Sequence, residues 1–106
     1  DDMMILKGVN IFPIQIEKIL MQFKELGNNY LITLHTVNNN DEMLIEVELN
    51  DLFTDDYSTL QKLTRDITRQ LKDELLLTPK VKLVDKDSLP VSEGKAVRVK
   101  DLRNFL

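Results

Sequence analysis

The chain has 106 residues, with 14 Lys and Arg against 18 Asp and Glu, one His, and no Cys or Trp. This length suits one domain, and a 42% hydrophobic share with 30% charged residues is typical of a globular rather than a disordered chain. The net charge of −4 and the lack of a basic block or a long apolar run argue against a nucleic-acid surface and a membrane span, and the lack of Cys excludes disulfides and thiol catalysis.

The first third of the chain predicts two short extended segments and a helix. Two apolar stretches within residues 3–12 are separated at Gly8, and Gly predicts a turn there because it adopts backbone angles that other residues avoid. Pro13 suits the first turn of a helix. Apolar residues then recur at helical spacing over residues 16–26, and Gly27 predicts the end of that helix.

The middle of the chain predicts a hairpin and a second helix. Residues 30–37 are rich in β-branched and aromatic side chains, and residues 42–49 alternate between apolar and mostly acidic ones, so two antiparallel strands are expected around a polar turn. Ser58-Thr59-Leu60-Gln61 is typical of a capping box at a helix start. The inward stripe of the helix that follows is predicted to be Leu60, Leu63, Ile67, Leu71 and Leu75.

The last quarter predicts a strand and a tail. Residues 80–84 suit a short strand, residues 85–94 an irregular segment, and residues 97–106 a short terminal helix. The whole order predicts an α+β fold in one domain over residues 1–106. We expect a small βαββαβ-type sandwich in which two helices pack on a mainly antiparallel sheet, preceded by a short β-hairpin.

The acidic residues and the His predict little chemistry. Three aspartates lack the spacing and the closing Glu of an EF-hand, so a solvated loop before the second helix is expected: Asp51, Asp55 and Asp56. Glu46 and Glu48 share one side of a strand, and an exposed sheet face is the simpler interpretation than a catalytic carboxylate pair. His35 lies within a strand, where we expect a half-buried neutral imidazole. No metal site is predicted.

Two segments are less ordinary. In residues 4–13, MILKGVNIFP, Gly8 either permits a tight turn or lets a narrow ligand pass close to the backbone. In residues 89–98, LPVSEGKAVR, a lysine follows Gly94 in a polar loop. Such a loop is usually only solvated, but its lysine can also deliver a point charge to a phosphate or a carboxylate. It is not a Walker A loop, because the other Gly and the following Ser or Thr are missing.

Together these segments resemble the C-terminal domain of adenylate-forming enzymes. The opening DDMMILKGVNIFPIQIE is similar to the hinge-proximal motif of that domain, and its GVNIFP wording is close to the phenylacetate–coenzyme A ligase branch. LPVSEGKAVR is similar to the final motif of that branch, which carries the catalytic lysine. The resemblance covers essentially the whole chain, with both motifs at the expected ends.

The resemblance implies an ATP-dependent, AMP-forming acid–coenzyme A ligase, with phenylacetate as the expected acid. A large N-terminal adenylation domain of the same polypeptide would bind ATP, Mg²⁺ and the aryl acid, so this chain alone is expected to be inactive and to hold no cofactor. The C-terminal domain would serve adenylation in one orientation and attack by the thiol of coenzyme A in another. Because the chain starts at Asp1 and not at Met, we expect a piece of a longer cytoplasmic enzyme, without nucleic-acid or membrane partners.

The same resemblance assigns roles to four residues. Lys95 matches the catalytic lysine, and Gly8 matches the Gly beside the pantetheine channel of coenzyme A. Lys7 occupies a position that is usually basic on that face, and Asp1, or else Asp2, matches the hinge acid. A unit-charge pair about 4 Å apart gives roughly 4 kcal/mol at an effective dielectric near 20, so a lysine between two anions can lower the adenylation barrier substantially.

A different class of protein remains open at this point. Small βαββαβ domains also occur as free-standing ferredoxin-like regulatory modules that bind a small metabolite, and a fold alone does not decide function.

Overall fold

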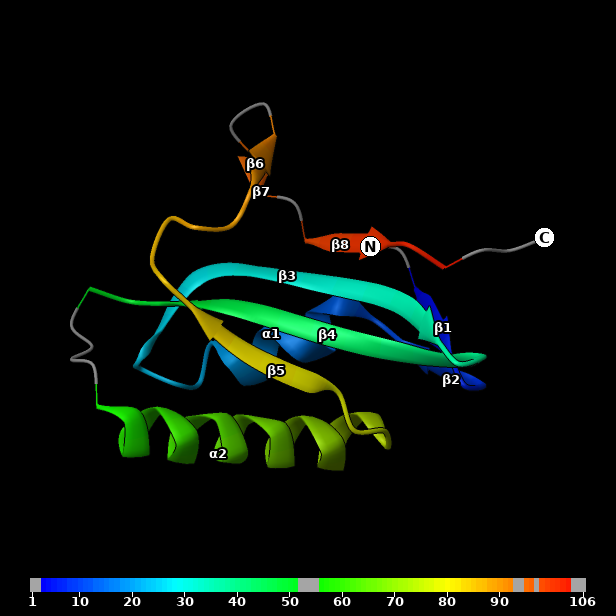
Figure 1. Cartoon of the computed structure of the whole chain (residues 1–106), viewed down its shortest axis with the longest axis horizontal. Coiled ribbons are helices and arrows are strands. Elements are labelled where there is room, and N and C mark those ends of the chain that lie inside the picture. The colour runs from blue at the N-terminus through cyan, green and yellow to red at the C-terminus, as the bar shows by residue number, and fades with distance from the viewer. Residues whose placement is uncertain (1–2, 52–55, 93–94, 97, 104–106) are drawn as a thin grey trace.

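A computed structural model describes residues 3–51, 56–92, 95–96 and 98–103, with the backbone alone for residues 92, 95 and 96. The described residues form two helices and eight short to medium strands, shown in Figure 1. In chain order these are β1 (Met4–Leu6), β2 (Val9–Ile11), α1 (Pro13–Leu20), β3 (Leu26–Val37), β4 (Asn40–Leu49), α2 (Tyr57–Leu75), β5 (Lys80–Val84), β6 (Val91–Ser92), β7 (Lys95–Ala96) and β8 (Val99–Asp101).

The main sheet is built around the predicted hairpin. Four of the described strands form it in the order β5-β4-β3-β8, and β3 and β4 are antiparallel. The outer strands differ from the predicted pattern, because β5 runs parallel to β4 and β8 runs parallel to β3. Parallel neighbours need a crossover connection, which α2 supplies between β4 and β5. The α+β class is confirmed, and the sheet is mixed.

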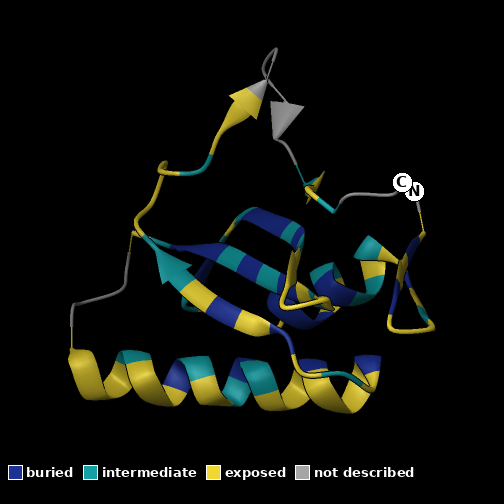
Figure 2. Cartoon of the chain, turned by 45° about the vertical axis from the view of Figure 1, so that its right-hand side comes forward, coloured by how far each residue is buried: buried dark blue, intermediate teal, exposed yellow. Residues whose placement is uncertain are grey.

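The core lies between one face of this sheet and both helices (Figure 2). Alternate residues of β3 and β4 face it, and Ile32, Leu34 and Ile45 are fully buried. The predicted stripe of α2 is confirmed, since Leu63, Ile67, Leu71 and Leu75 are buried and Leu60 packs against the core. The apolar residues at every second position of β3 and β4 therefore pack against the apolar stripe of α2, which repeats every 3.6 residues, in one core. Neither described helix combines the length and the hydrophobicity that crossing a bilayer requires.

The predicted opening hairpin is present, with its turn at Lys7 and Gly8. Strands β1 and β2 pair antiparallel, with Leu6 opposite Val9. The turn residues have φ values of 50° and 77°, and a two-residue turn with both φ values positive matches the twist of the strands that it joins. Met4 and Leu6 are buried, so this hairpin is part of the core's edge.

The first helix is shorter than predicted. It ends at Leu20, and the chain turns before β3 begins at Leu26. Gly27 is therefore a strand residue and not a helix cap, and a Cβ there would lie 3.4 Å from the carbonyl oxygen of Glu48 on β4. Phe23 and Leu26 still contact the core from a turn and a strand, so their helical spacing was misleading.

Two further expectations about local structure are wrong. The second helix starts at Tyr57 with Asp56 as its N-cap, so the predicted capping box at Ser58 does not form. The terminal helix over residues 97–106 is contradicted by β8, which pairs with β3. Pairing satisfies backbone groups on the edge of β3, because the Ile32 N–H and the Leu34 carbonyl both form hydrogen bonds with this last segment. Residues 104–106 lie outside the described residues.

Candidate functional site

The structure places Lys95 and Gly8, the two residues singled out in the unusual segments, on separate hairpins. Lys95 lies on β7, paired with Ser92 of β6, in a hairpin that projects away from the main sheet (Figure 1). Lys7 and Gly8 form the β1–β2 turn, which lies elsewhere in both views of the chain (Figures 1 and 2). Asp1, like Asp2, lies outside the described residues. Among the residues that the structure describes, Lys95 therefore does not form a joint site with Lys7 and Gly8.

The β1–β2 turn is open to solvent. An added Cβ at Gly8 would meet nothing within 4 Å, so the φ of 77° and not crowding accounts for the Gly in this chain alone. Lys7 is exposed beside it. Both residues line a groove that continues over the start of α1 and along β8, past Glu17 and Arg98. The turn thus presents an exposed lysine and, beside it, the bare backbone of Gly8.

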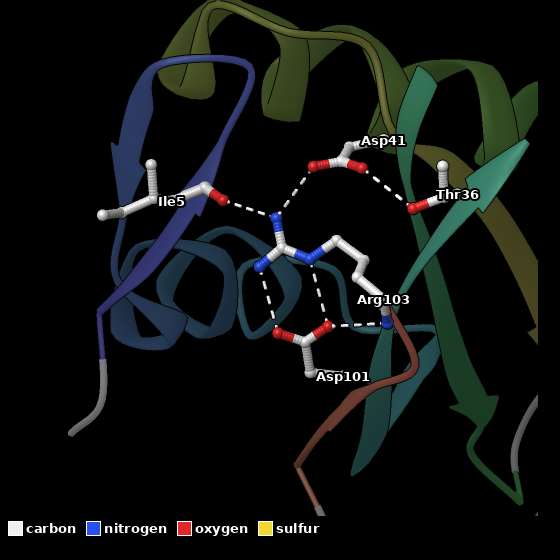
Figure 3. A network of polar contacts seen from close by, with 5 residues as sticks. All are labelled: Ile5, Thr36, Asp41, Asp101 and Arg103. Carbon is white, nitrogen blue, oxygen red and sulfur yellow. Dashed lines mark hydrogen bonds and ion pairs between the residues drawn. The ribbon is translucent and has the colours of Figure 1, made fainter. Parts of the chain in front are cut away.

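A buried arginine fixes this hairpin to the rest of the domain (Figure 3). Arg103, whose side chain is 7% exposed, donates from Nη1 to the carbonyl oxygen of Ile5 at 2.6 Å and to Oδ2 of Asp41 at 3.0 Å. Its Nε and Nη2 donate to the two carboxylate oxygens of Asp101, each at 3.0 Å. Thr36 donates to the other oxygen of Asp41 at 3.0 Å. We call these five residues the Arg103 cluster.

The charges in the Arg103 cluster stabilise one another. Hydrogen bonds from Arg103 hold the pKa of the Asp101 carboxyl below its usual value, and hydrogen bonds to Asp101 and Asp41 raise the pKa of Arg103. The cluster joins β1 to the end of β3, the start of β4, and β8 with Arg103 shortly after it. Sequence reasoning missed Arg103, and the one local signal was the opposite charge of Asp101 two residues earlier.

Glu48 contradicts the predicted exposed face of β4. It is 4% exposed, because the chain that follows β5 covers this side of the strand. Its Oε1 accepts from the backbone N–H of Asp87 at 2.9 Å, and its Oε2 accepts from the backbone N–H of Leu89 at 3.0 Å. The side-chain amide of Asn29 donates to Oε2 at 3.2 Å. Because three hydrogen bonds compensate its loss of hydration, the Glu48 carboxylate is part of the folded interior and not a solvated surface group.

Arg98 continues this polar network from the other side. Its Nη1 donates to Oδ1 of Asn29 at 3.1 Å, and its guanidinium lies 4.5 Å from the centre of the Tyr30 ring. The Tyr30 hydroxyl donates to Glu17 at 2.9 Å. Burial, with the nearby Glu17 carboxylate, raises the pKa of Tyr30 to about 12, although Arg98 acts in the opposite direction. We call Glu48, Asn29 and Arg98 the Glu48 network.

The aspartates before α2 have separate partners. Asp51 forms an ion pair with Lys86 at 2.5 Å. Asp56 accepts a hydrogen bond from the Thr59 hydroxyl at 2.5 Å, which lowers the pKa of its carboxyl. Asp55 lies outside the described residues. Within the part of the chain that the structure describes, no three His, Cys, Asp or Glu side chains are grouped as a metal site requires.

The other two candidates behave as structural residues. Glu46 is partly exposed, as predicted for the outer side of β4. His35 is half-buried in β3 as predicted, with its Nε2 3.5 Å from Oε1 of Glu42 on the neighbouring strand. Cross-strand pairs of this kind contribute modestly to sheet stability.

Comparison with known proteins decides the family. Residues 8–103 match the model of the AMP-binding enzyme C-terminal domain. The chain belongs to this family. It is 33% identical over 107 residues to a phenylacetate–coenzyme A ligase of Escherichia coli K12 and 35% identical over 104 residues to one of Pseudomonas putida. The matches cover 100% and 97% of this chain and 24% of each relative, so the chain spans about a quarter of their length.

Solved structures agree with this assignment. A domain of phenylacetate–coenzyme A ligase from Bacteroides vulgatus is 71% identical, with a TM-score of 0.93 over 100% of this chain and 97% of that one. A 2-hydroxyisobutyryl-CoA ligase, crystallised with 2-HIB-AMP and CoA in its thioesterification state, is 29% identical with a TM-score of 0.85, covering 97% of this chain and 22% of that one. A free-standing regulatory module is not favoured by these matches.

Proposed function

We propose that residues 1–106 form the mobile C-terminal domain of an AMP-forming aryl-acid–coenzyme A ligase that acts on phenylacetate. The observation that carries the proposal is the 71% identity, over nearly the full length of both chains, to a domain of phenylacetate–coenzyme A ligase. The curated relatives with that name are about four times as long, which leaves room for an N-terminal adenylation domain on the same polypeptide. In this proposal the N-terminal domain binds ATP, Mg²⁺ and the acid.

The first half-reaction brings two anions together. A carboxylate oxygen of the acid attacks the α-phosphorus of ATP, the bond to the β-phosphate oxygen breaks, and acyl adenylate and pyrophosphate form. A fixed cation at this point stabilises the developing charge more than the separated reactants. Lys95 supplies that cation in our proposal. Its place on a hairpin that projects from the sheet supports this role, because such a hairpin can enter a cleft of a partner domain.

The second half-reaction uses the β1–β2 turn. The sulfur of coenzyme A attacks the acyl carbonyl, and AMP leaves with its electron pair to give the thioester. Gly8 offers bare backbone along which the pantetheine arm passes, and the open space around its Cα supports this assignment. Lys7 lies beside it, exposed, and a cation there suits an anionic ligand such as coenzyme A. Since Lys95 and Gly8 lie in different parts of the domain, a rotation about a hinge at Asp1 would present them in turn.

The test separates the two half-reactions in the full-length enzyme. We expect Lys95→Ala to slow adenylation by about 10²–10³-fold, because a transition-state cation of this kind contributes roughly that much. Adenylation is measured by pyrophosphate–ATP exchange. Thioester formation from preformed phenylacetyl adenylate should stay close to wild type. Lys100→Ala, at an exposed position of β8, is the matched control. Equal losses in both assays for Lys95→Ala would overturn the proposal.

A further inference from the structure

The hairpin that carries Lys95 depends on the points where the chain leaves and rejoins the main sheet. β6 and β7 pair at only two positions, and so short a two-stranded hairpin has little stability of its own. The chain reaches it from β5 and returns to the sheet at β8, as Figure 1 shows. The orientation of the hairpin is therefore set by these two anchor points.

The first anchor is the carboxylate of Glu48. Its two oxygens accept from the backbone N–H groups of Asp87 and Leu89, at 2.9 and 3.0 Å. Hydrogen bonds to an ionised carboxylate are stronger than neutral ones, and this carboxylate is almost fully shielded from water. Asp87 has a φ of 63°, which is an uncommon conformation for a residue other than Gly. The contact thus holds a specific backbone shape directly before the hairpin.

The second anchor is Arg98, directly after the hairpin. Its carbonyl oxygen accepts from the Ile32 N–H at 2.8 Å, while its guanidinium donates to Asn29 and lies over the Tyr30 ring. Asn29 also donates to Glu48. One amide therefore bridges the two anchors, so both ends of the hairpin are tied to one polar network.

We infer that Glu48 is a positioning residue for the adenylation half-reaction. Its carboxylate fixes the backbone of residues 87–89 and, through it, the β6–β7 hairpin that carries Lys95. This inference rests on the proposed role of Lys95, and Glu48 itself does not touch the reacting atoms. Asn29 supports the same positioning, because it donates a hydrogen bond to Glu48 and accepts one from Arg98, where the chain returns to the sheet.

The test uses Glu48→Gln in the full-length enzyme. The substitution keeps the side-chain size but places an NH₂ group where one N–H donor points at Oε1 or two point at Oε2, so the loop shifts. We expect pyrophosphate–ATP exchange to fall about 10- to 100-fold, since a misplacement of about 1 Å can cost that much. Thioester formation from preformed adenylate should change little. Glu46→Gln, on the same side of β4 but outside the network, is the matched control.

A double variant, Glu48→Gln combined with Lys95→Ala, shows whether Glu48 affects adenylation by positioning Lys95 or in another way. If Glu48 acts through Lys95, Glu48→Gln should cause no further loss of adenylation once Lys95 is replaced. A full additional loss there, or an equal loss in both half-reactions of Glu48→Gln alone, overturns the inference. If Lys95→Ala slows adenylation but Glu48→Gln leaves it normal, the inference about Glu48 is wrong, while the proposed function stands. Normal adenylation in Lys95→Ala would instead refute the proposed function.

A second variant covers the case in which Glu48→Gln does not fold. Asn29→Ala removes one donor to Glu48 and the acceptor of Arg98 without leaving a misplaced charge or amide. We expect a smaller loss of adenylation in the same direction, again absent from the thioester assay and from the Lys95→Ala background. Unchanged adenylation in a folded Asn29→Ala enzyme would contradict a network that positions the hairpin.

Discussion

At the scale of single residues, the buried phenol of Tyr30 makes the free energy of unfolding depend on pH in the alkaline range. Its pKa is about 12 in the folded chain, mainly because burial disfavours the phenolate, against about 10 for an unfolded tyrosine. The folded state therefore holds the proton more tightly. The corresponding stability is complete below about pH 10 and is lost as the pH rises toward 12.

The Tyr30 prediction is tested by removing the hydroxyl. We expect the free energy of unfolding of wild type to fall between about pH 10 and 12 more steeply than that of Tyr30→Phe, as measured by urea unfolding at a series of pH values. Glu17→Gln should narrow the difference, because the Glu17 carboxylate contributes to the raised pKa of Tyr30. Parallel curves for wild type and Tyr30→Phe would contradict the pKa assignment.

The Arg103 cluster predicts a large cost for losing one side chain. Arg103→Leu leaves Asp41 and Asp101 without their shared cation and the Ile5 carbonyl without its donor. The Arg103 side chain is shielded, but the Asp41 and Asp101 side chains are 33% and 37% exposed, so we expect a loss of about 2 kcal/mol in the free energy of unfolding. Arg103→Lys should lose less, since it keeps the charge but not the two-pronged geometry.

An exposed arginine provides the control for Arg103. Arg69 on α2 pairs with Asp66 at 2.8 Å, and 68% of its side chain is exposed. Surface pairs of this kind contribute about 0.5 kcal/mol or less. Urea unfolding of Arg69→Leu should therefore differ little from wild type. Similar losses for Arg69→Leu and Arg103→Leu would show that the cluster adds nothing beyond a surface ion pair.

At the scale of elements, the sequence predicted those whose pattern and burial agree. The period-3.6 stripe of α2 and the short strand over residues 80–84 match the structure, because each buries one face against the core. The end of α1 was missed, since Phe23 and Leu26 reach the core from a turn and a strand at spacings that also suit a helix. The strand β8 was missed because the free edge of β3, and not local propensity, determines its conformation.

Two different demands on Gly8 in the β1–β2 turn can be measured separately: its positive φ and, in our proposal, space for the pantetheine arm. Its φ of 77° predicts that Gly8→Ala lowers the free energy of unfolding by about 1 kcal/mol, whereas Gly8→Asn lowers it less because Asn tolerates the left-handed region. The proposed pantetheine path predicts the reverse order for the thioester step, because Asn is larger than Ala. Urea unfolding and thioester formation from preformed adenylate measure the two orders.

The Gly8 comparison has a clear contrary outcome. If thioester rates follow stability, with Ala slower than Asn, then Gly8 serves the turn alone and the pantetheine path lies elsewhere. Pyrophosphate–ATP exchange should remain near wild type in both variants, which excludes a general loss of folded enzyme.

At the scale of the whole molecule, the polar contacts that matter most join distant parts of the chain. Glu48 lies 39 and 41 residues from its backbone donors, and Arg103 lies 62 residues from Asp41 and 98 from Ile5. No local pattern encodes such partners, so a period-two strand predicted a solvent-facing Glu48. Lys95 and Gly8, in contrast, were found through motifs in the sequence, and their roles remain predictions.

The separation of Lys95 and Gly8 leads to a prediction about combined variants. Lys95 lies on β7 and Gly8 in the β1–β2 turn, two elements that lie apart in both views of the chain, so their effects should be independent (Figures 1 and 2). In the full-length enzyme, Gly8→Trp should impair thioester formation and spare adenylation, because a large side chain would obstruct the pantetheine path. The Lys95→Ala/Gly8→Trp double variant should then show the adenylation rate of Lys95→Ala and the thioester rate of Gly8→Trp.

Each half-reaction of the double variant is measured by itself, with pyrophosphate–ATP exchange and with preformed phenylacetyl adenylate. Urea unfolding of both single variants establishes that they are folded. If Gly8→Trp also lowered adenylation, or if Lys95→Ala changed the thioester rate of the double variant, the two regions would be coupled. A domain that presents one face at a time requires the opposite, because each face is then exposed to only one of the two chemical steps.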